Sequence, residues 1–90
     1  MTHIVLSKKQ CLPCRQVIKI IKANNLDWDI MYHYEDPTFY EVLGVKSAPS
    51  LVKVMSERNF IKEYKIVAVG LDEIIEYSSN YVFSTNEEEE

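Results

Sequence analysis

Hydrophobic residues follow two different spacings in the first part of the chain. Residues 3–7 form a short, largely apolar run, which is typical of a buried strand. In the segment 14–24 the side chains of Val17, Ile18 and Ile21 recur at helical spacing, and most other positions are charged or polar. This pattern predicts a strand followed closely by an amphipathic helix that packs against a sheet.

The middle of the chain changes from helical spacing to strict alternation. Apolar or aromatic residues occupy every second position over 28–34, as in a strand with one buried face, and this strand would pair parallel with the first in a right-handed β-α-β unit. Asp36 and Pro37 then form an N-cap and a first turn, and Gly44 is placed to end a short helix. We expect its buried face to consist of Phe39, Val42 and Leu43.

The second half of the chain predicts a hairpin and a last helix. Residues 50–55 and 60–64 have strand composition and are separated by a turn at 56–59, so we expect them to pair antiparallel. Residues 65–69 fit either an extension of the second strand or a linker. A final helix is expected over residues 71–79. Its sheet-facing residues are expected to be Ile74, Ile75, Tyr77 and Ser78, with an apolar patch at 81–83 after it.

The candidate chemistry lies between the first strand and the first helix. Cys11 and Cys14 are the only cysteines, and they enclose Leu12 and Pro13 in a Cys-x-x-Cys motif. Free backbone N–H groups at a helix start favour a negative charge, so a thiol there ionises more easily, and the thiolate is the reactive form. Cys11 lies at the mouth of the helix and Cys14 one turn inside, close enough to form a disulfide. Pro13 suits the first turn, where a missing N–H loses no partner.

Length and hydropathy indicate one compact domain. Ninety residues, 47% of them hydrophobic, suffice for a two-layer core and exclude disorder over most of the chain. No apolar run approaches the roughly 20 residues that span a membrane, and no signal peptide is recognisable. We therefore expect a cytoplasmic monomer without a membrane partner, in a compartment where a disulfide is more often catalytic than structural.

The formal charge of −4 comes from the last four residues. Glu87–Glu90 are all acidic, and the other ten acidic residues balance the ten basic ones. A neutral domain excludes nucleic-acid binding driven by net charge. We expect residues 1–84 to form the folded domain and residues 85–90 to form a solvated, disordered acidic tail.

The order of these elements resembles the thioredoxin fold. That α/β fold has the order β-α-β-α-β-β-α, a four-stranded mixed sheet flanked by helices, and a Cys-x-x-Cys between the first strand and the first helix. Within it, three stretches make the chain similar to glutaredoxins. They are Lys8, three residues before Cys11; Ser47-Ala48-Pro49, ahead of the third strand; and Gly70-Leu71-Asp72, at the start of the last helix.

Several positions depart from the patterns of both families. Val69 replaces the first glycine of a glutaredoxin Gly-Gly pair, and the motif interior is Leu12-Pro13 rather than Pro-Tyr. Proline next to the second cysteine is the thioredoxin choice. However, Gln10 stands where thioredoxins have tryptophan, and Val5 stands where they have a buried acid. The resemblance therefore implies a glutaredoxin-like dithiol protein with a hybrid active site.

The resemblance implies a thiol–disulfide oxidoreductase that reduces protein or glutathione mixed disulfides. Cys11 would attack the substrate disulfide, and Cys14 would then displace the reduced substrate. No bound metal or organic cofactor is implied, and the reductant would be glutathione or a flavin reductase of the thioredoxin reductase class. The implied substrate-binding residues are Lys8, Leu12, Pro13, Ala48, Pro49, Gly70, Leu71 and Asp72, with a cis Ala48–Pro49 peptide.

Other interpretations of the same residues stay open. The two cysteines would also serve as ligands of zinc, together with His3 and His33, or of an iron–sulfur cluster across a dimer. They would equally close a disulfide in an interaction domain that has no catalytic role. Lys8 would otherwise be an ordinary loop lysine, and Asp72 would be an acid that the helix dipole favours at a helix start. Pro49 would otherwise be a trans proline in a turn.

Overall fold

The structure is a computed structural model that describes residues 2–58 and 61–88. Strands and helices follow each other in the order that the sequence pattern predicted. The elements are β1 (His3–Ser7), α1 (Leu12–Ala23), β2 (Trp28–Tyr32), α2 (Pro37–Leu43), β3 (Ser50–Arg58), β4 (Ile61–Val69) and α3 (Leu71–Glu88).

The four strands form one mixed sheet in the order β2-β1-β3-β4. β1 is parallel to β2 and antiparallel to β3, and β4 is antiparallel to β3. In this register Leu6 lies opposite Ser50, which lies opposite Val69 on its other side, and Ser7 lies opposite Tyr32. The last residues of β1, β2 and β4 and the first residue of β3 therefore share one end of the sheet.

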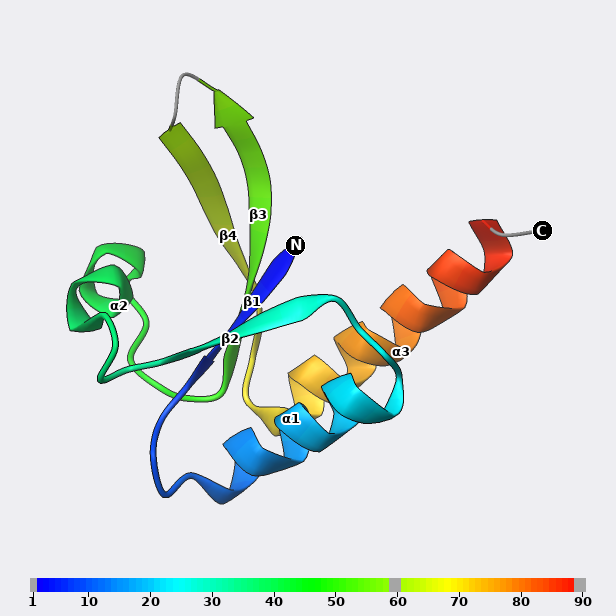
Figure 1. The fold of residues 1–90 in the computed structure, drawn as a ribbon, viewed down its shortest axis with the longest axis horizontal. Coiled ribbons are helices and arrows are strands. Elements are labelled where there is room, and N and C mark those ends of the chain that lie inside the picture. The colour runs from blue at the N-terminus through cyan, green and yellow to red at the C-terminus, as the bar shows by residue number, and fades with distance from the viewer. Residues whose placement is uncertain (1, 59–60, 89–90) are drawn as a thin grey trace.

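Helices cover both faces of this sheet (Figure 1). α1 and α3 lie on one face and α2 lies on the other. Successive residues of a strand point to opposite faces, so Val5 packs beneath α1 and α3, whereas Ile4 and Leu6 pack beneath α2. The first core consists of Val5, Val17, Ile21, Trp28, Leu51, Ala68 and Ile74, and the second of Ile4, Leu6, Tyr40 and Val52.

The β3–β4 hairpin is longer than the sequence pattern predicted, and it projects beyond the helices (Figure 1). β3 continues to Arg58, so the turn predicted at 56–59 is wrong for its first three residues. Asn59, the predicted last residue of the turn, and Phe60, the predicted first residue of the next strand, lie outside the described residues. Residues 65–69 belong to β4. The sequence pattern underestimated the length of β3 because residues 56–58 are polar and charged, as is common in turns. In the structure these three residues pair with β4 across the hairpin.

Two boundaries near the cysteines also differ from the prediction. α1 begins at Leu12 rather than at Cys14, because Cys11 is its N-cap. The Cys11 carbonyl already accepts the Arg15 N–H, at 3.2 Å, as the first bond of the helix. β2 ends at Tyr32, two residues earlier than predicted.

α2 has the predicted caps but only part of the predicted buried face. Asp36 accepts the Phe39 N–H at 3.1 Å, and Gly44 ends the helix with a φ of 72°, which suits glycine. Phe39 packs at the margin of the core, but Val42 is 79% exposed, so its predicted burial is wrong. Tyr40, which was not part of the predicted buried face, is 2% exposed. Its burial is possible because its hydroxyl donates to backbone carbonyl oxygens of the sheet beneath the helix.

α3 extends past its predicted end at Ser79 and reaches Glu88. Tyr81, predicted in a patch after the helix, lies within it, and Ile75, predicted to face the sheet, is 40% exposed. Residues 85–88, predicted to be part of a disordered tail, are helical, while the last two residues lie outside the described part. The division of the chain after residue 84 stays a prediction. No helix in the described ranges has both the length and the hydropathy that crossing a membrane requires.

Candidate active site

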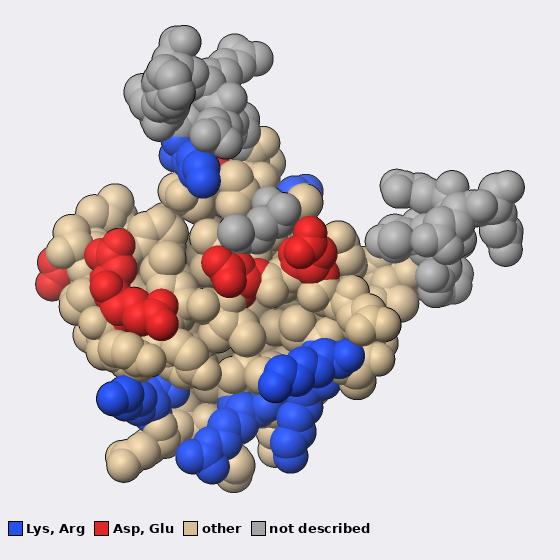
Figure 2. All heavy atoms as spheres, viewed as in Figure 1, with Lys and Arg blue, Asp and Glu red and all other residues tan. Residues whose placement is uncertain are grey.

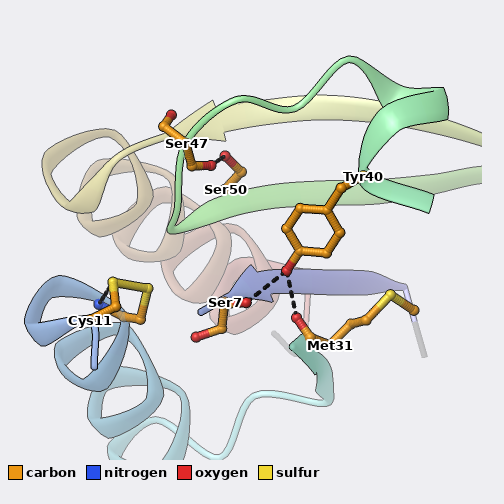
Figure 3. The surroundings of a disulfide bond; sticks show 7 residues. Ser7, Cys11, Met31, Tyr40, Ser47 and Ser50 are labelled. Atoms are coloured by element: carbon orange, nitrogen blue, oxygen red, sulfur yellow. Dashed lines mark hydrogen bonds between the residues drawn. A yellow bond between two sulfur atoms is a disulfide. The ribbon is translucent and has the colours of Figure 1, made fainter. Parts of the chain in front are cut away.

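The two cysteines form a disulfide at the start of α1, with their Cα atoms 5.2 Å apart (Figure 3). Cys11 has an extended backbone, with φ of −114° and ψ of 106°, and its Sγ accepts the Cys14 N–H at 3.3 Å. That N–H is one of the groups at a helix start that have no partner within the helix. The same donor and the helix dipole would stabilise a Cys11 thiolate once the disulfide is reduced.

The two sulfur-bearing residues differ in access. Cys14 is 1% exposed, whereas Cys11 is partly exposed and its neighbour Leu12 is 66% exposed. Pro13 is exposed in the first turn, where it replaces an N–H that the helix does not use. A substrate approaching the helix start therefore meets Cys11 first, with Cys14 buried behind it.

Segments that are distant in the sequence meet at the sheet end that carries the disulfide. The loop after β1 leads into Cys11, Pro49 directly precedes β3, and Gly70 directly follows β4. The Gly70 N–H donates to the Pro49 carbonyl at 2.8 Å, which joins the start of α3 to that loop. The Ala48–Pro49 peptide is cis, which confirms the expectation from the resemblance.

A cavity of about 320 Å³ lies beside the motif, between the loop after β1, α1 and β2. Its walls include Lys8, Lys9, Cys14, Arg15, Ile18 and Tyr32. Sequence reasoning singled out Lys8 and Cys14 but missed Lys9, Arg15 and Tyr32. The signal that would have found Tyr32 is the parallel register, which places it beside Ser7 at the start of the loop.

Comparison with solved structures identifies the fold. The chain aligns with thioredoxin 1 from the thermophilic eubacterium Thermosipho africanus TCF52B with a TM-score of 0.56 and 14% identity, over 96% of this chain and 99% of that chain. The chain has the thioredoxin fold. A structure described as a malarial protein aligns with a TM-score of 0.46 and 19% identity, over 89% of this chain and 97% of that chain. No protein-family model matches the sequence, and no curated protein matches it significantly.

The predicted substrate-binding residues occupy different depths in this thioredoxin fold. Lys8, Leu12, Pro13 and Asp72 are exposed, Ala48, Gly70 and Leu71 are half-buried, and Pro49 is buried. The topology brings Pro49 and Gly70 together at the sheet end. Within the described residues, neither Lys8 nor Asp72 has a side-chain hydrogen bond to another part of the site. Their roles in substrate binding stay predictions.

Tyr40 supports the same sheet end from the opposite face, and sequence reasoning missed it. Its hydroxyl lies 2.8 Å from the carbonyl oxygens of Ser7 and Met31, near the ends of β1 and β2 (Figure 3). Burial raises the pKa of Tyr40 to about 12, so the hydroxyl stays protonated and serves as the hydrogen-bond donor to these carbonyl oxygens. The only sequence signal was a tyrosine between the apolar positions of a short helix. By holding the two strand ends, Tyr40 fixes the base of the loop that carries the cysteines.

His3, one of the residues considered above as a zinc ligand, is buried in the core of this protein. Its ring is hydrogen-bonded to the hydroxyls of Thr2 and Tyr77, at 2.7 and 2.8 Å. Burial, with a smaller contribution from Lys53, lowers the pKa of His3 to about 4. Within residues 2–58 and 61–88, no three His, Cys, Asp or Glu side chains are grouped as a metal site requires.

Proposed function

We propose that the protein is a glutaredoxin-like thiol–disulfide oxidoreductase that reduces disulfides in proteins or with glutathione. The observation that carries the proposal is the position of the Cys11–Cys14 pair at the start of α1 in a thioredoxin fold. Cys11 is accessible there, and Cys14 is buried behind it. A structural disulfide between residues so close in sequence closes a very short loop and adds little stability. Redox use therefore explains the pair better than a structural role.

The proposed reaction starts with the reduced protein. The Cys11 thiolate attacks one sulfur of the substrate disulfide, the substrate S–S bond breaks, and the other substrate sulfur leaves as a thiolate. Cys14 then loses its proton and attacks the Cys11 Sγ, which displaces the second substrate sulfur. Two electrons pass to the substrate, whose sulfurs take up two protons, and the Cys11–Cys14 disulfide forms.

The reductant that returns this disulfide to the dithiol is proposed to be glutathione. Lys8 would meet a carboxylate of glutathione, and the backbone of Ala48 would pair with its cysteinyl part. Asp72 would meet the ammonium group, while the N–H groups at the start of α3 would bind the adjacent carboxylate. A flavin reductase of the thioredoxin reductase class is the alternative electron donor.

Single-cysteine variants test the proposed reaction. The pre-reduced protein, freed of excess reductant, should convert a peptide disulfide to thiols in a stoichiometric burst. Cys14→Ser should stop at a mixed disulfide, seen by mass spectrometry as an adduct of one substrate half. Cys11→Ser should give no thiol beyond the uncatalysed rate. If Cys11→Ser retained exchange, the assignment of Cys11 as the nucleophile would be wrong.

A further inference from the structure

The cysteines lie in the longest stretch of the chain without acidic residues. Residues 1–26 contain five of the ten lysines and arginines and none of the fourteen aspartates and glutamates. The five are Lys8, Lys9, Arg15, Lys19 and Lys22. Figure 2 shows basic side chains gathered over α1, whereas acidic side chains gather over α2. A protein of negative net charge thus presents a cationic surface around its disulfide.

The cavity beside the motif concentrates this positive charge. Lys8, Lys9 and Arg15 line it together with Cys14, and none of its lining residues is acidic. Its volume of about 320 Å³ is at the lower end of ligand pockets, which span roughly 300–1,000 Å³. The cavity is therefore large enough for one or a few side chains of a partner, and its charge favours carboxylates.

The wall of the cavity contains polar groups that an anionic occupant would meet. Ser7 lines it, and the buried Ser7 hydroxyl has no hydrogen-bond partner among the described residues. In Figure 3 this side chain points away from Tyr40. The Lys9 ammonium lies over the ring of Tyr34, 4.5 Å from its centroid, which holds that cation at the rim. An apolar occupant would leave the Ser7 hydroxyl without a partner, whereas a carboxylate would accept its hydrogen bond and would also pair with the Lys9 cation.

We infer that this cavity binds acidic residues of a protein partner, so that the preferred substrate is a disulfide flanked by glutamate or aspartate. The inference rests on the proposed function and adds a substrate class to it. A carboxylate held by Lys8, Lys9 or Arg15 would place a nearby disulfide next to the cysteine motif. Complementary charge also raises the rate of encounter, most strongly at low ionic strength.

A short acidic segment fits this surface better than a nucleic acid does. Three acidic residues lie at or within α2, namely Glu35, Asp36 and Glu41. A long polyanion that extends from the cavity towards α2 would therefore be repelled. A peptide needs to fill only the cavity. The wall also contains Cys14, and the proposed thiol–disulfide exchange requires a substrate that carries a disulfide, which a peptide has and an ordinary nucleic acid does not.

The test compares two disulfide peptides that differ only in their flanking residues, glutamates in one and glutamines in the other. The pre-reduced full-length protein is mixed with each, and the rate of thiol formation is measured. Each rate is divided by the rate with dithiothreitol, which corrects for the intrinsic reactivity of the peptide. We expect the acidic peptide to react about tenfold faster at low salt. The advantage should fall below about twofold near 0.5 M salt, where exposed charges are screened.

Charge-reversal variants locate the effect. Lys9→Glu/Arg15→Glu should reverse the preference, so that the glutamine peptide reacts faster. Lys62→Glu/Lys65→Glu makes the same change in net charge at exposed positions of β4 that do not line the cavity, and it should keep the tenfold ratio. Equal loss of preference in both variants would overturn the cavity as the binding site.

The outcomes separate this inference from the proposed function. Equal rates for both peptides, each well above the rate of Cys11→Ser, would overturn the inference and leave the oxidoreductase standing. No reduction of either peptide would contradict the oxidoreductase. Binding of serine-substituted peptides to the oxidised protein, measured by fluorescence anisotropy, then decides the inference alone, and equal affinities would overturn it. A single-stranded oligonucleotide that competes better than a glutamate peptide of equal charge would also overturn it.

Discussion

The two cysteines have unequal surroundings although they share one helical turn. Cys14 is 1% exposed, whereas Cys11 is partly exposed and accepts a backbone N–H. We therefore expect iodoacetamide, added to the reduced protein at mildly acidic pH, to label Cys11 first. Peptide mapping by mass spectrometry measures the order of labelling, and Cys14→Ser should be labelled at the wild-type rate. Preferential labelling of Cys14 would contradict the assignment.

Tyr40 allows a test of how the base of the cysteine loop is held. Tyr40→Phe removes the donor to the carbonyls of Ser7 and Met31, although Ser7 keeps the His33 N–H at 2.9 Å. The free energy of unfolding should fall by about 1 kcal/mol. Tyr34→Phe is the matched control, since Tyr34 is 57% exposed, and should stay within about 0.5 kcal/mol of wild type. Urea unfolding measures both, and equal effects would disprove the role of the Tyr40 hydroxyl.

His3 couples the first core to pH. Its ring packs among aromatic rings from two other elements, with centroid distances of 4.9 Å to Trp28, 5.4 Å to Tyr77 and 5.3 Å to Tyr81. Lys53 lies opposite it on β3. Burial first, and the Lys53 charge second, lower the pKa of His3 from 6.5 to about 4. The imidazole therefore stays neutral in the folded state at pH values where it is charged in the unfolded chain.

This difference has a defined effect on stability. Because the folded pKa is the lower one, the unfolded state binds the proton first, and stability falls as pH drops from 6.5 towards 4. We expect His3 to account for a loss of about 2 kcal/mol between pH 7 and pH 5. His3→Asn should flatten this slope, and His33→Asn, at an exposed position, should not. An NMR titration of the wild-type ring checks the pKa directly, and a midpoint near 6.5 would refute the argument.

At the scale of elements, α3 has a part that packs on the core and a part that continues beyond it. The Tyr81 ring lies 5.4 Å from Trp28, whereas residues 85–88 carry the helix into the acidic end of the chain. A chain ending at residue 84 should keep its free energy of unfolding within about 0.5 kcal/mol. A chain ending at residue 80 loses the Tyr81 ring and should lose about 2 kcal/mol. Equal losses, measured by urea unfolding, would refute the predicted division after residue 84.

Elements were predictable from the sequence where a local chemical signal marks them. Asp36 and Gly44 define both ends of α2 because a cap and a left-handed residue act within one turn. The far ends of β3 and α3 have no such signal. Residues 56–58 read as a turn, yet they pair with β4. Tyr40 was missed because the hydrophobic pattern assigns only apolar residues to the core. The polar hydroxyl of Tyr40 is buried because backbone carbonyl oxygens of two strands accept its hydrogen bond, and these strands meet it only in the folded protein.

At the scale of the whole molecule, the site divides into a local part and a part that only the topology assembles. The Cys-x-x-Cys motif could be found from the sequence, because two thiols and a helix start lie within four residues. The cavity could not, because it depends on the register of β2 against β1, which places Tyr32 opposite Ser7 at the start of the loop that holds Lys9. The junction of Pro49 with Gly70 is equally non-local: the resemblance named both as substrate-binding residues, but their hydrogen bond was not predicted.

The choice of electron donor depends on groups that only the fold brings together. Lys8 lies in the loop after β1 and Asp72 in the first turn of α3, around the same sheet end. If glutathione is the reductant, Lys8→Ala and Asp72→Ala should each raise its KM by roughly 1.5- to 5-fold, as expected for exposed charge contacts of about 0.2–1 kcal/mol. Their alkylation rates at Cys11 should match the wild type, because neither change alters the helix start. Lys62→Ala, on β4, is the matched control and should leave the KM unchanged.

Val69 should oppose these contacts, because its Cβ stands where the resemblance to glutaredoxins implies a glycine, next to the backbone that would bind the γ-glutamyl end. It is 41% exposed, and its N–H donates to Glu73 at 3.1 Å. We therefore expect weak glutathione binding in the wild type and a lower KM in Val69→Gly. If Val69, Lys8 and Asp72 can all be changed without effect, while thioredoxin reductase and NADPH reduce the protein rapidly, the donor is the flavin enzyme. The proposed dithiol chemistry would still stand, because it depends on Cys11 and Cys14 and not on the surface proposed to bind glutathione.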